Sequence, residues 1–151
     1  MTTTIMTKDE RQAFLEQPLI AVISIPEPGR GPLVVPVWYR YEPGGDVCVW
    51  TGSKSHKAQL LQGAERISIC IMDPKPPYKY VSVEGPFSIE PVQFERDVRA
   101  MALHYFGPQY GESYLNDIGG PGGVTEDILI RIHPERWHTV DYSKLGPLPQ
   151  S

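Results

Sequence analysis

The chain has 151 residues, enough for one domain with a single hydrophobic core. Its formal net charge of −4 disfavours a general nucleic-acid-binding role, and no apolar run is long enough to cross a membrane. Two cysteines and an N-terminus without signal-peptide features predict a cytoplasmic setting. The 16 prolines and 14 glycines separate short elements, which is typical of a β-rich domain with defined turns.

The first half of the chain predicts a helix, three strands and a second helix. Thr7 and Glu10 match a capping box that opens the first helix, and Pro18 stops it. Strands are expected at 19–25, 33–41 and 47–51, joined as an antiparallel meander, followed by a helix from Ser53 or Ser55 to Gln62.

The second half predicts four more strands and one amphipathic helix. A fourth strand is expected at 66–72 and a long fifth at 78–90, bent at Gly85-Pro86. Pro91 is expected to open a helix that Gly107 ends. The glycine-rich segment within 107–123 is read as a mobile loop, with a lid over a site as the less favoured interpretation. Strands at 124–133 and 136–141 complete the sheet.

These elements predict a mainly β fold with short helices (α+β). Six or seven antiparallel strands imply a closed or nearly closed barrel. We expect residues 1–142 to form this single domain and residues 143–151 to form an extended, proline-rich tail. A barrel of this size fills its interior with side chains, so a large ligand must bind outside, most naturally in a cleft between two subunits.

The segment after the third strand carries the clearest binding signal. Lys54, Ser55, His56 and Lys57 lie where a helix begins, and the small hydroxylated residue Thr51 precedes them. Backbone N–H groups at a helix start bind anions, and acidic side chains are the ones normally preferred there. Because the lysines oppose that preference, the pattern favours a phosphate site over its alternative, a solvated lysine-rich helix start.

The second strand carries an unusual face. Pro36, Trp38 and Arg40 alternate with Val35 and Val37, so they point to the other side of the strand. Pro36 fits an edge strand or a bulge, where neighbouring backbone groups are free to contact a ligand ring. A plain edge strand packed by aromatics is the alternative, and these residues alone favour it slightly.

The remaining candidates are weaker. Lys79 lies between Tyr78 and Tyr80. It could contact an anionic group while one of the tyrosines stacks on a ligand ring, or the segment could be an ordinary amphipathic strand, and the sequence supports the two interpretations equally. His133 and His138 are read as ordinary strand-end histidines, because a metal site needs a further ligand. The sequence has no local signature of a catalytic nucleophile and no phosphate-binding glycine motif.

Four segments taken together resemble the split β-barrel superfamily typified by pyridoxamine 5′-phosphate oxidase, and most closely its flavin/deazaflavin oxidoreductase branch. The segments are 34–39, 54–58, 77–81 and 136–146. The resemblance implies an FMN-binding-protein-like split barrel that forms a homodimer with two cofactor sites at the subunit interface.

The resemblance also implies roles for individual residues. The cofactor ring would lie along Val35, Pro36, Val37 and Trp38, and Ser55 and Lys57 would bind the cofactor phosphate, supported by Thr51 and Lys54. Trp137 is similar to the C-terminal aromatic residue of the family.

Two departures qualify the resemblance. His56 stands where many flavin-binding members have arginine, so one phosphate contact would depend on pH. The C-terminal segment Arg136-Trp137-His138 does not match the arginine-rich substrate motif of pyridoxamine phosphate oxidases, so oxidation of that vitamin is not expected.

The expected function is an oxidoreductase that uses the deazaflavin coenzyme F-420 for hydride transfer to or from a small molecule, with FMN as the second cofactor candidate. The preference for F-420 comes from the lysines at 54 and 57 and from Lys75 or Lys79, which would meet its anionic tail. A non-enzymatic cofactor carrier of the same fold is the alternative, and a structural barrel whose lysines bind nothing is a third.

Overall fold

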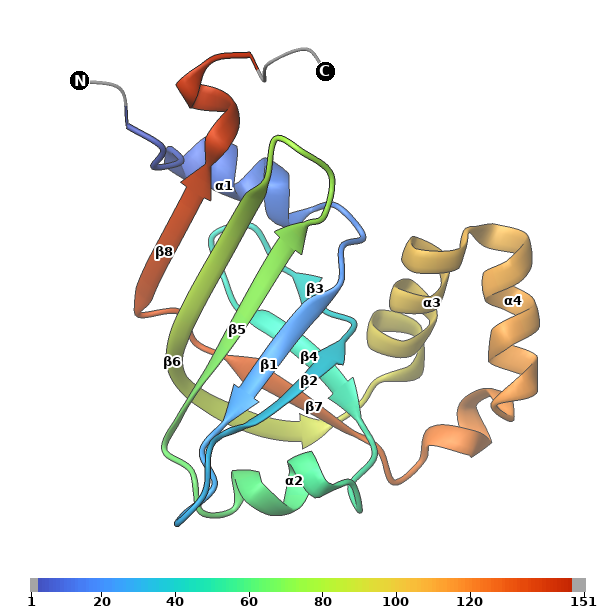
Figure 1. The fold of residues 1–151 in the computed structure, drawn as a ribbon. Helices are drawn as coiled ribbons and strands as arrows, with labels where there is room; N and C mark the ends of the chain where they lie inside the picture. Colours follow the sequence, from blue (N-terminus) through green and yellow to red (C-terminus); the bar gives the residue numbers. More distant parts are fainter. Residues whose placement is uncertain (1–2, 148–151) are drawn as a thin grey trace.

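The computed structural model describes residues 3–147, which form one curled antiparallel sheet with short helices around it (Figure 1). The strand order is β2-β1-β5-β6-β7-β4-β3. Strand β8 lies outside this order and pairs with residues 79–84 of β6, which also pair with β5. The strands are β1 (Ala21–Ile25), β2 (Leu33–Val37), β3 (Arg40–Tyr41), β4 (Val47–Thr51), β5 (Arg66–Asp73), β6 (Lys79–Pro91), β7 (Ile128–Ile132) and β8 (Arg136–Asp141). The helical elements are α1 (Lys8–Leu15), α2 (His56–Leu61), η1 (Phe94–Arg99), α3 (Ala100–Phe106), α4 (Pro108–Asp117), η2 (Gly120–Val124) and η3 (Tyr142–Leu145). This architecture confirms the expected antiparallel barrel.

Strand β6 links the two halves of the barrel. Its residues 79–86 pair with β5, and residues 87–91 pair with β7. The change of partner falls at Gly85-Pro86, where the sequence predicts a bend, and β6 curves strongly in Figure 1. Gly85 is required there, because a Cβ at this position would lie 1.9 Å from the backbone oxygen of His133.

We therefore expect Gly85→Ala to lower the free energy of unfolding by about 2 kcal/mol, within the range for overpacking a filled interior. The cause is the backbone of the β7–β8 connection, which cannot rotate away as a side chain could. Gly31→Ala is the matched control, since a Cβ there meets nothing within 4 Å. Urea unfolding of both variants measures the difference, and equal midpoints would contradict the argument.

The predicted second strand is broken in two, so the expected simple meander is wrong in detail. Residues 33–37 pair with β1 as β2, whereas Arg40 and Tyr41 pair with β4 as β3. The connection between them is fixed by Tyr39, whose buried hydroxyl lies 2.9 Å from the carbonyl oxygens of Leu15 and Gln17. The chain thus crosses from one half of the barrel to the other at Trp38–Tyr39.

The alternation predicted for this segment is confirmed. Val35, Val37 and Tyr39 face the barrel interior and contact its buried cluster of valine, isoleucine and leucine side chains. Trp38 packs on the opposite side, against a second cluster under α3. Pro36 lies on β2, an edge strand at the end of the sheet order, where a residue without an N–H is tolerated.

The helices after β6 differ from expectation. Pro91 is the last residue of β6 and does not open the helix, which begins at Phe94. The loop expected within 107–123 is instead α4 and η2, because Pro108 takes the first position of a new helix after the turn at Gly107. Gly111 lets α4 approach α3 closely, since a Cβ there would lie 3.0 Å from the carbonyl oxygen of Ala102.

The two ends of the described chain lie together. The capping box of Thr7 and Glu10 is confirmed. Residues 142–145 form η3, so the expected extended tail does not begin at residue 143; its last residues, 148–151, lie outside the described range. Lys144 donates to the carbonyl oxygen of Ile5 and to Glu10, both at 2.9 Å. No helix within residues 3–147 combines the length and apolar character that spanning a membrane requires.

Candidate functional site

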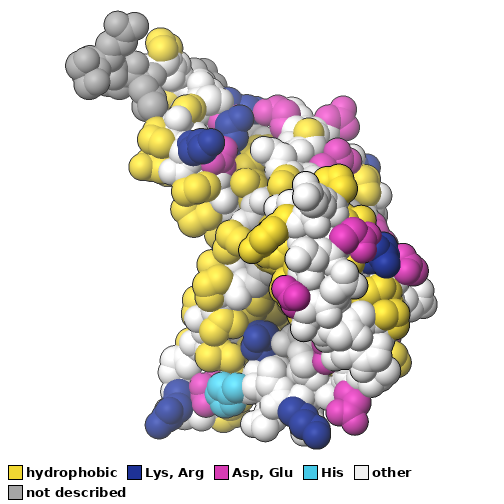
Figure 2. Space-filling model, turned by 90° about the vertical axis from the view of Figure 1, so that its right-hand side faces the viewer, with side chains coloured by type: hydrophobic (Ala, Val, Ile, Leu, Met, Phe, Trp, Pro, Cys, Tyr) yellow, Lys and Arg dark blue, Asp and Glu magenta, His cyan; other side chains and the backbone are white. Residues whose placement is uncertain are grey.

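The open side of the barrel lies between β2 and β4. β3 pairs only with Val47 and Cys48, so within residues 3–147 the rest of that edge of β4 has no neighbouring strand. A groove of about 330 Å³ occupies this place, within the usual range for small-molecule sites of about 300–1,000 Å³. Its lining residues are Pro36, Val37, Trp38, Trp50, Thr51, Gly52, Lys57, Tyr114 and Asp127. Figure 2 shows this side of the molecule, with a hollow where hydrophobic side chains meet a Lys or Arg side chain.

The groove is lined by residues from two predicted segments that are separate in the sequence. Pro36, Val37 and Trp38 come from the second predicted strand, whereas Thr51 and Lys57 come from the predicted phosphate segment. The break in that strand explains their proximity, because it brings the end of β2 to the end of β4. The structure therefore assembles five of the eleven predicted cofactor residues along one surface.

An aromatic cluster forms one wall. The indole of Trp38 stacks on Tyr105 with ring centroids 4.8 Å apart and an interplanar angle of 7°. Phe106 and Tyr114 approach the same indole at 5.0 and 5.6 Å. Because these rings come from α3 and α4, the wall is held by packing and needs little ordering when a flat ligand binds.

Four lining residues were not predicted from the sequence: Trp50, Gly52, Tyr114 and Asp127. The indole N–H of Trp50 donates to Asp127 at 2.8 Å, which fixes both side chains. Burial, and secondarily the charge of Asp127, raises the pKa of Tyr114, so its phenol stays protonated. Tyr114 was missed because its segment was read as a loop; recognising Pro108 as a helix start could have found it.

Lys57 is the cation at the other end of the groove. It is half-buried and has no ion-pair partner within residues 3–147. Its neighbours differ, because Lys54 is 89% exposed and lies 3.9 Å from Glu126, and His56 lies 3.6 Å from Glu27. Lys54 and His56 thus flank the groove without lining it.

Two hydroxyl groups lie beside Lys57. The Ser55 hydroxyl oxygen accepts from the backbone N–H of Ala58 at 3.1 Å and from Thr51 at 3.3 Å. Because a serine hydroxyl has one proton and two acceptor sites, Ser55 keeps its proton for a further acceptor. Helix α2 has only six residues, so Lys57 and the Ser55 hydroxyl, rather than the helix dipole, would dominate an anion contact.

The remaining predicted residues lie elsewhere in the chain. Val35 faces the core. Lys79 begins β6 near α1, at the opposite end of the barrel from α2 (Figure 1), and lies 3.9 Å from Asp141. Trp137 is on β8, where the guanidinium of Arg11 lies 4.2 Å from its ring centroid. Within one chain, neither Lys79 nor Trp137 lines the groove.

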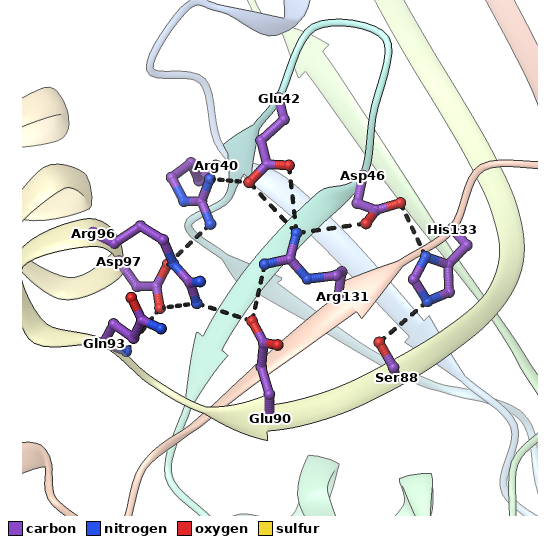
Figure 3. Close-up of polar contacts among 10 residues, drawn as sticks. All are labelled: Arg40, Glu42, Asp46, Ser88, Glu90, Gln93, Arg96, Asp97, Arg131 and His133. Atoms are coloured by element: carbon purple, nitrogen blue, oxygen red, sulfur yellow. Dashed lines mark hydrogen bonds and ion pairs between the residues drawn. The ribbon is translucent and has the colours of Figure 1, made fainter.

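A network of charged side chains fixes the helical wall to the sheet (Figure 3). Asp97, fully buried in η1, accepts from Arg40 of β3 at 2.9 Å and from Arg96 at 2.8 Å. Burial acts to raise the pKa of Asp97, but hydrogen bonds from Arg96 and the backbone N–H of Gln93 outweigh it and hold that pKa below its usual range. The network continues to Arg131, which contacts Glu42, Asp46 and Glu90.

The histidines take part in similar structural contacts. His133 lies 3.0 Å from Asp46 and 3.1 Å from Ser88, and His138 lies 3.3 Å from the Tyr80 hydroxyl. In the described part of the chain, no three His, Cys, Asp or Glu side chains gather as a metal site.

Comparisons with known proteins identify the fold. No protein-family model matches the chain, and no curated protein sequence does. Among solved structures, a conserved hypothetical protein from Mycobacterium tuberculosis has a TM-score of 0.81 at 24% identity, covering 100% of this chain and 94% of that one. An F-420 reductase has a TM-score of 0.69 at 20% identity, covering 84% and 94%. A candidate pyridoxamine 5′-phosphate oxidase from Listeria innocua has a TM-score of 0.65 at 17% identity, covering 87% and 96%.

These neighbours match nearly the whole chain although few residues are identical. The order of strands around the curled sheet is therefore the shared property. The resemblance seen in the sequence is confirmed at the level of the fold: the chain has the same split β-barrel fold as these structures, among them the candidate pyridoxamine 5′-phosphate oxidase.

Proposed function

We propose that the chain is an oxidoreductase that binds coenzyme F-420, or FMN as the alternative, in the groove between β2, β4, α2 and α4. The observation that carries this proposal is the groove itself, where an aromatic wall at Trp38 faces the same space as Lys57, a cation without an ion-pair partner in the described chain. A ring joined to a phosphate needs these two environments side by side. The F-420 reductase among the structural neighbours supports the choice of cofactor.

The residues present fit such a cofactor. Pro36, Val37 and Trp38 would hold the ring, since they offer an apolar surface at the edge of β2. Lys57 and the hydroxyl of Ser55 would bind the phosphate through charge-assisted hydrogen bonds, and Thr51 would orient Ser55 by donating its own proton to the Ser55 oxygen.

The bound cofactor would supply hydride transfer, and the protein would supply position and polarity. Tyr114 keeps its phenolic proton and lines the groove, so it is placed to donate a hydrogen bond to a ligand. Trp50 donates a direct hydrogen bond to Asp127, which fixes both side chains in the wall of the groove.

The proposal includes a homodimer. The outward face of β1, β2 and β5 exposes large apolar side chains: Ile20 is 50%, Val34 58% and Met72 45% exposed. Pro36 lies on this face next to Val22 and also lines the groove. A second copy packed there would bury the apolar face and close the groove, and it would bring Lys79 of the partner subunit towards the ligand.

We expect Val34→Glu to shift the protein from dimer to monomer, because it would bury an unpaired carboxylate at the interface. Sedimentation velocity measures the change. Ile89→Glu is the control, since Ile89 is 44% exposed on β6, outside this face. A wild-type monomer, or an unchanged dimer in Val34→Glu, would contradict the interface.

Absorbance and equilibrium titration test the function. The purified protein is titrated with F-420 and with FMN, and the reduced cofactor that binds is mixed with electron acceptors. Micromolar binding with oxidation of the reduced cofactor supports the proposal. Binding without turnover of any acceptor would instead support the carrier alternative, and no binding of either cofactor would reject both. A cytoplasmic setting belongs to the same proposal and fits the free thiols of Cys48 and Cys70.

A further inference from the structure

A second pocket lies between α1, the β3–β4 turn and the start of β8. Its volume is about 390 Å³, and its walls include Lys8, Arg11, Gly45 and Trp137. It shares no lining residue with the groove. Gly45 lies six residues before Thr51, so at about 3.3 Å per residue along β4 the two sites are about 20 Å apart.

Arg11 lines this pocket. Its guanidinium lies over the indole of Trp137, 4.2 Å from the ring centroid, and the Nε atom is buried without a hydrogen-bond partner. Within residues 3–147 no carboxylate pairs with Arg11 or with the neighbouring Lys8. Arginine on a protein surface is normally paired or fully hydrated, and a buried donor without an acceptor is rare in native proteins.

The rest of the pocket suits an anion. Gly44 and Gly45 form a wall without side chains, which lets a ligand approach the backbone closely. The acidic side chain in the wall, Asp46, is already engaged, because it lies 3.0 Å from His133 Nδ1 and 3.5 Å from Arg131. Lys8 and Arg11, which have no carboxylate partner among residues 3–147, therefore dominate the local potential, although the whole chain carries a net charge of −4.

We propose that this pocket binds the oxyanion group, phosphate or carboxylate, of a small organic molecule, with Arg11 and Lys8 as its ligands and Trp137 holding the guanidinium in place. The planar guanidinium presents paired N–H donors that match either oxyanion. The assignment gives Trp137 a role within one chain that does not depend on the cofactor groove.

Isothermal titration at constant ionic strength tests the site, with methyl phosphate in one arm and acetate in the other. Saturable binding with a stoichiometry of one per chain is expected in at least one arm, and the tighter arm identifies the oxyanion. Arg11→Gln should weaken it by about tenfold or more, as for loss of a charge-assisted hydrogen bond. Lys8→Gln, an exposed change that leaves folding intact, should weaken it several-fold.

Two variants serve as references. Arg30→Gln removes an exposed cation in the β1–β2 turn and should leave binding unchanged. Lys57→Ala reports on the groove, so the failure of this site is distinguishable from failure of the proposed function. The assignment is overturned if neither probe saturates, if Arg11→Gln and Lys8→Gln bind as the wild type does, or if Lys57→Ala abolishes binding while they retain it.

Discussion

Asp97→Asn is expected to lower the free energy of unfolding by about 3 kcal/mol, at the low end of the range for breaking a buried ion pair. Asp97 is fully buried and balances Arg40 and Arg96 together. The neutral amide would no longer balance the charge of the two guanidinium groups, although Glu42 would still contact Arg40 and Glu90 would still contact Arg96. The loss should loosen the wall formed by α3 and α4 as well as lower stability.

The pH dependence has a defined sign. Because the pKa of Asp97 is lower in the folded protein than in the unfolded chain, the carboxylate contributes stability above the unfolded value of about 3.9. That contribution is lost as the pH falls through the folded pKa. The Asn variant should therefore lose less stability than the wild type between pH 5 and pH 3 by urea unfolding, within this order-of-magnitude window.

Glu95→Gln is the matched control, since its carboxylate pairs with Arg99 in the same helical segment but is 73% exposed. Exposed ion pairs contribute about 0–1 kcal/mol, so a small effect is expected. If Asp97→Asn were as mild as Glu95→Gln, Asp97 would not be the link between the helical wall and the sheet.

Lys57→Ala is expected to weaken cofactor binding by about 1.5–3 kcal/mol, or roughly 10- to 150-fold, as for a charge-assisted hydrogen bond. The reason is that Lys57 lines the groove and has no acidic partner in the described chain. Fluorescence titration with F-420, and with FMN in parallel, measures the change.

Lys54→Ala is the control for this result. Lys54 is 89% exposed and lies next to Glu126, so its removal should weaken binding by no more than about fivefold. Equal losses in the two variants would mean that general positive charge, rather than Lys57 in the groove, binds the phosphate. An unchanged affinity of Lys57→Ala would remove this residue from the site.

Local signals in the sequence predicted much of the fold. Strand β4 and strand β8 have the predicted bounds, and the capping box at Thr7 is present, because short-range patterns determine these elements. The break at Trp38–Tyr39 could not be predicted, since it depends on Tyr39 reaching the end of α1. Helix α4 was missed because Pro108 and the following glycines were read only as breakers.

The candidate site was predicted only in part, because local patterns identify each segment but not the contact between segments. Each of the two segments carried its own signal, a proline and tryptophan on an edge strand and lysines after a strand. Their meeting in one groove depends on strand pairing between distant parts of the chain. Asp127 and Trp50 had no local signature, since their role arises from a hydrogen bond across 77 residues of sequence.

A crystal structure of the protein with its cofactor would show whether the groove between β2 and β4 is the cofactor site. We expect the ring to lie against Pro36, Val37 and Trp38, the phosphate to lie within hydrogen-bonding distance of Lys57, and a second copy of the chain to close the groove. A cofactor bound elsewhere, with the groove between β2 and β4 left to solvent, would contradict this expectation.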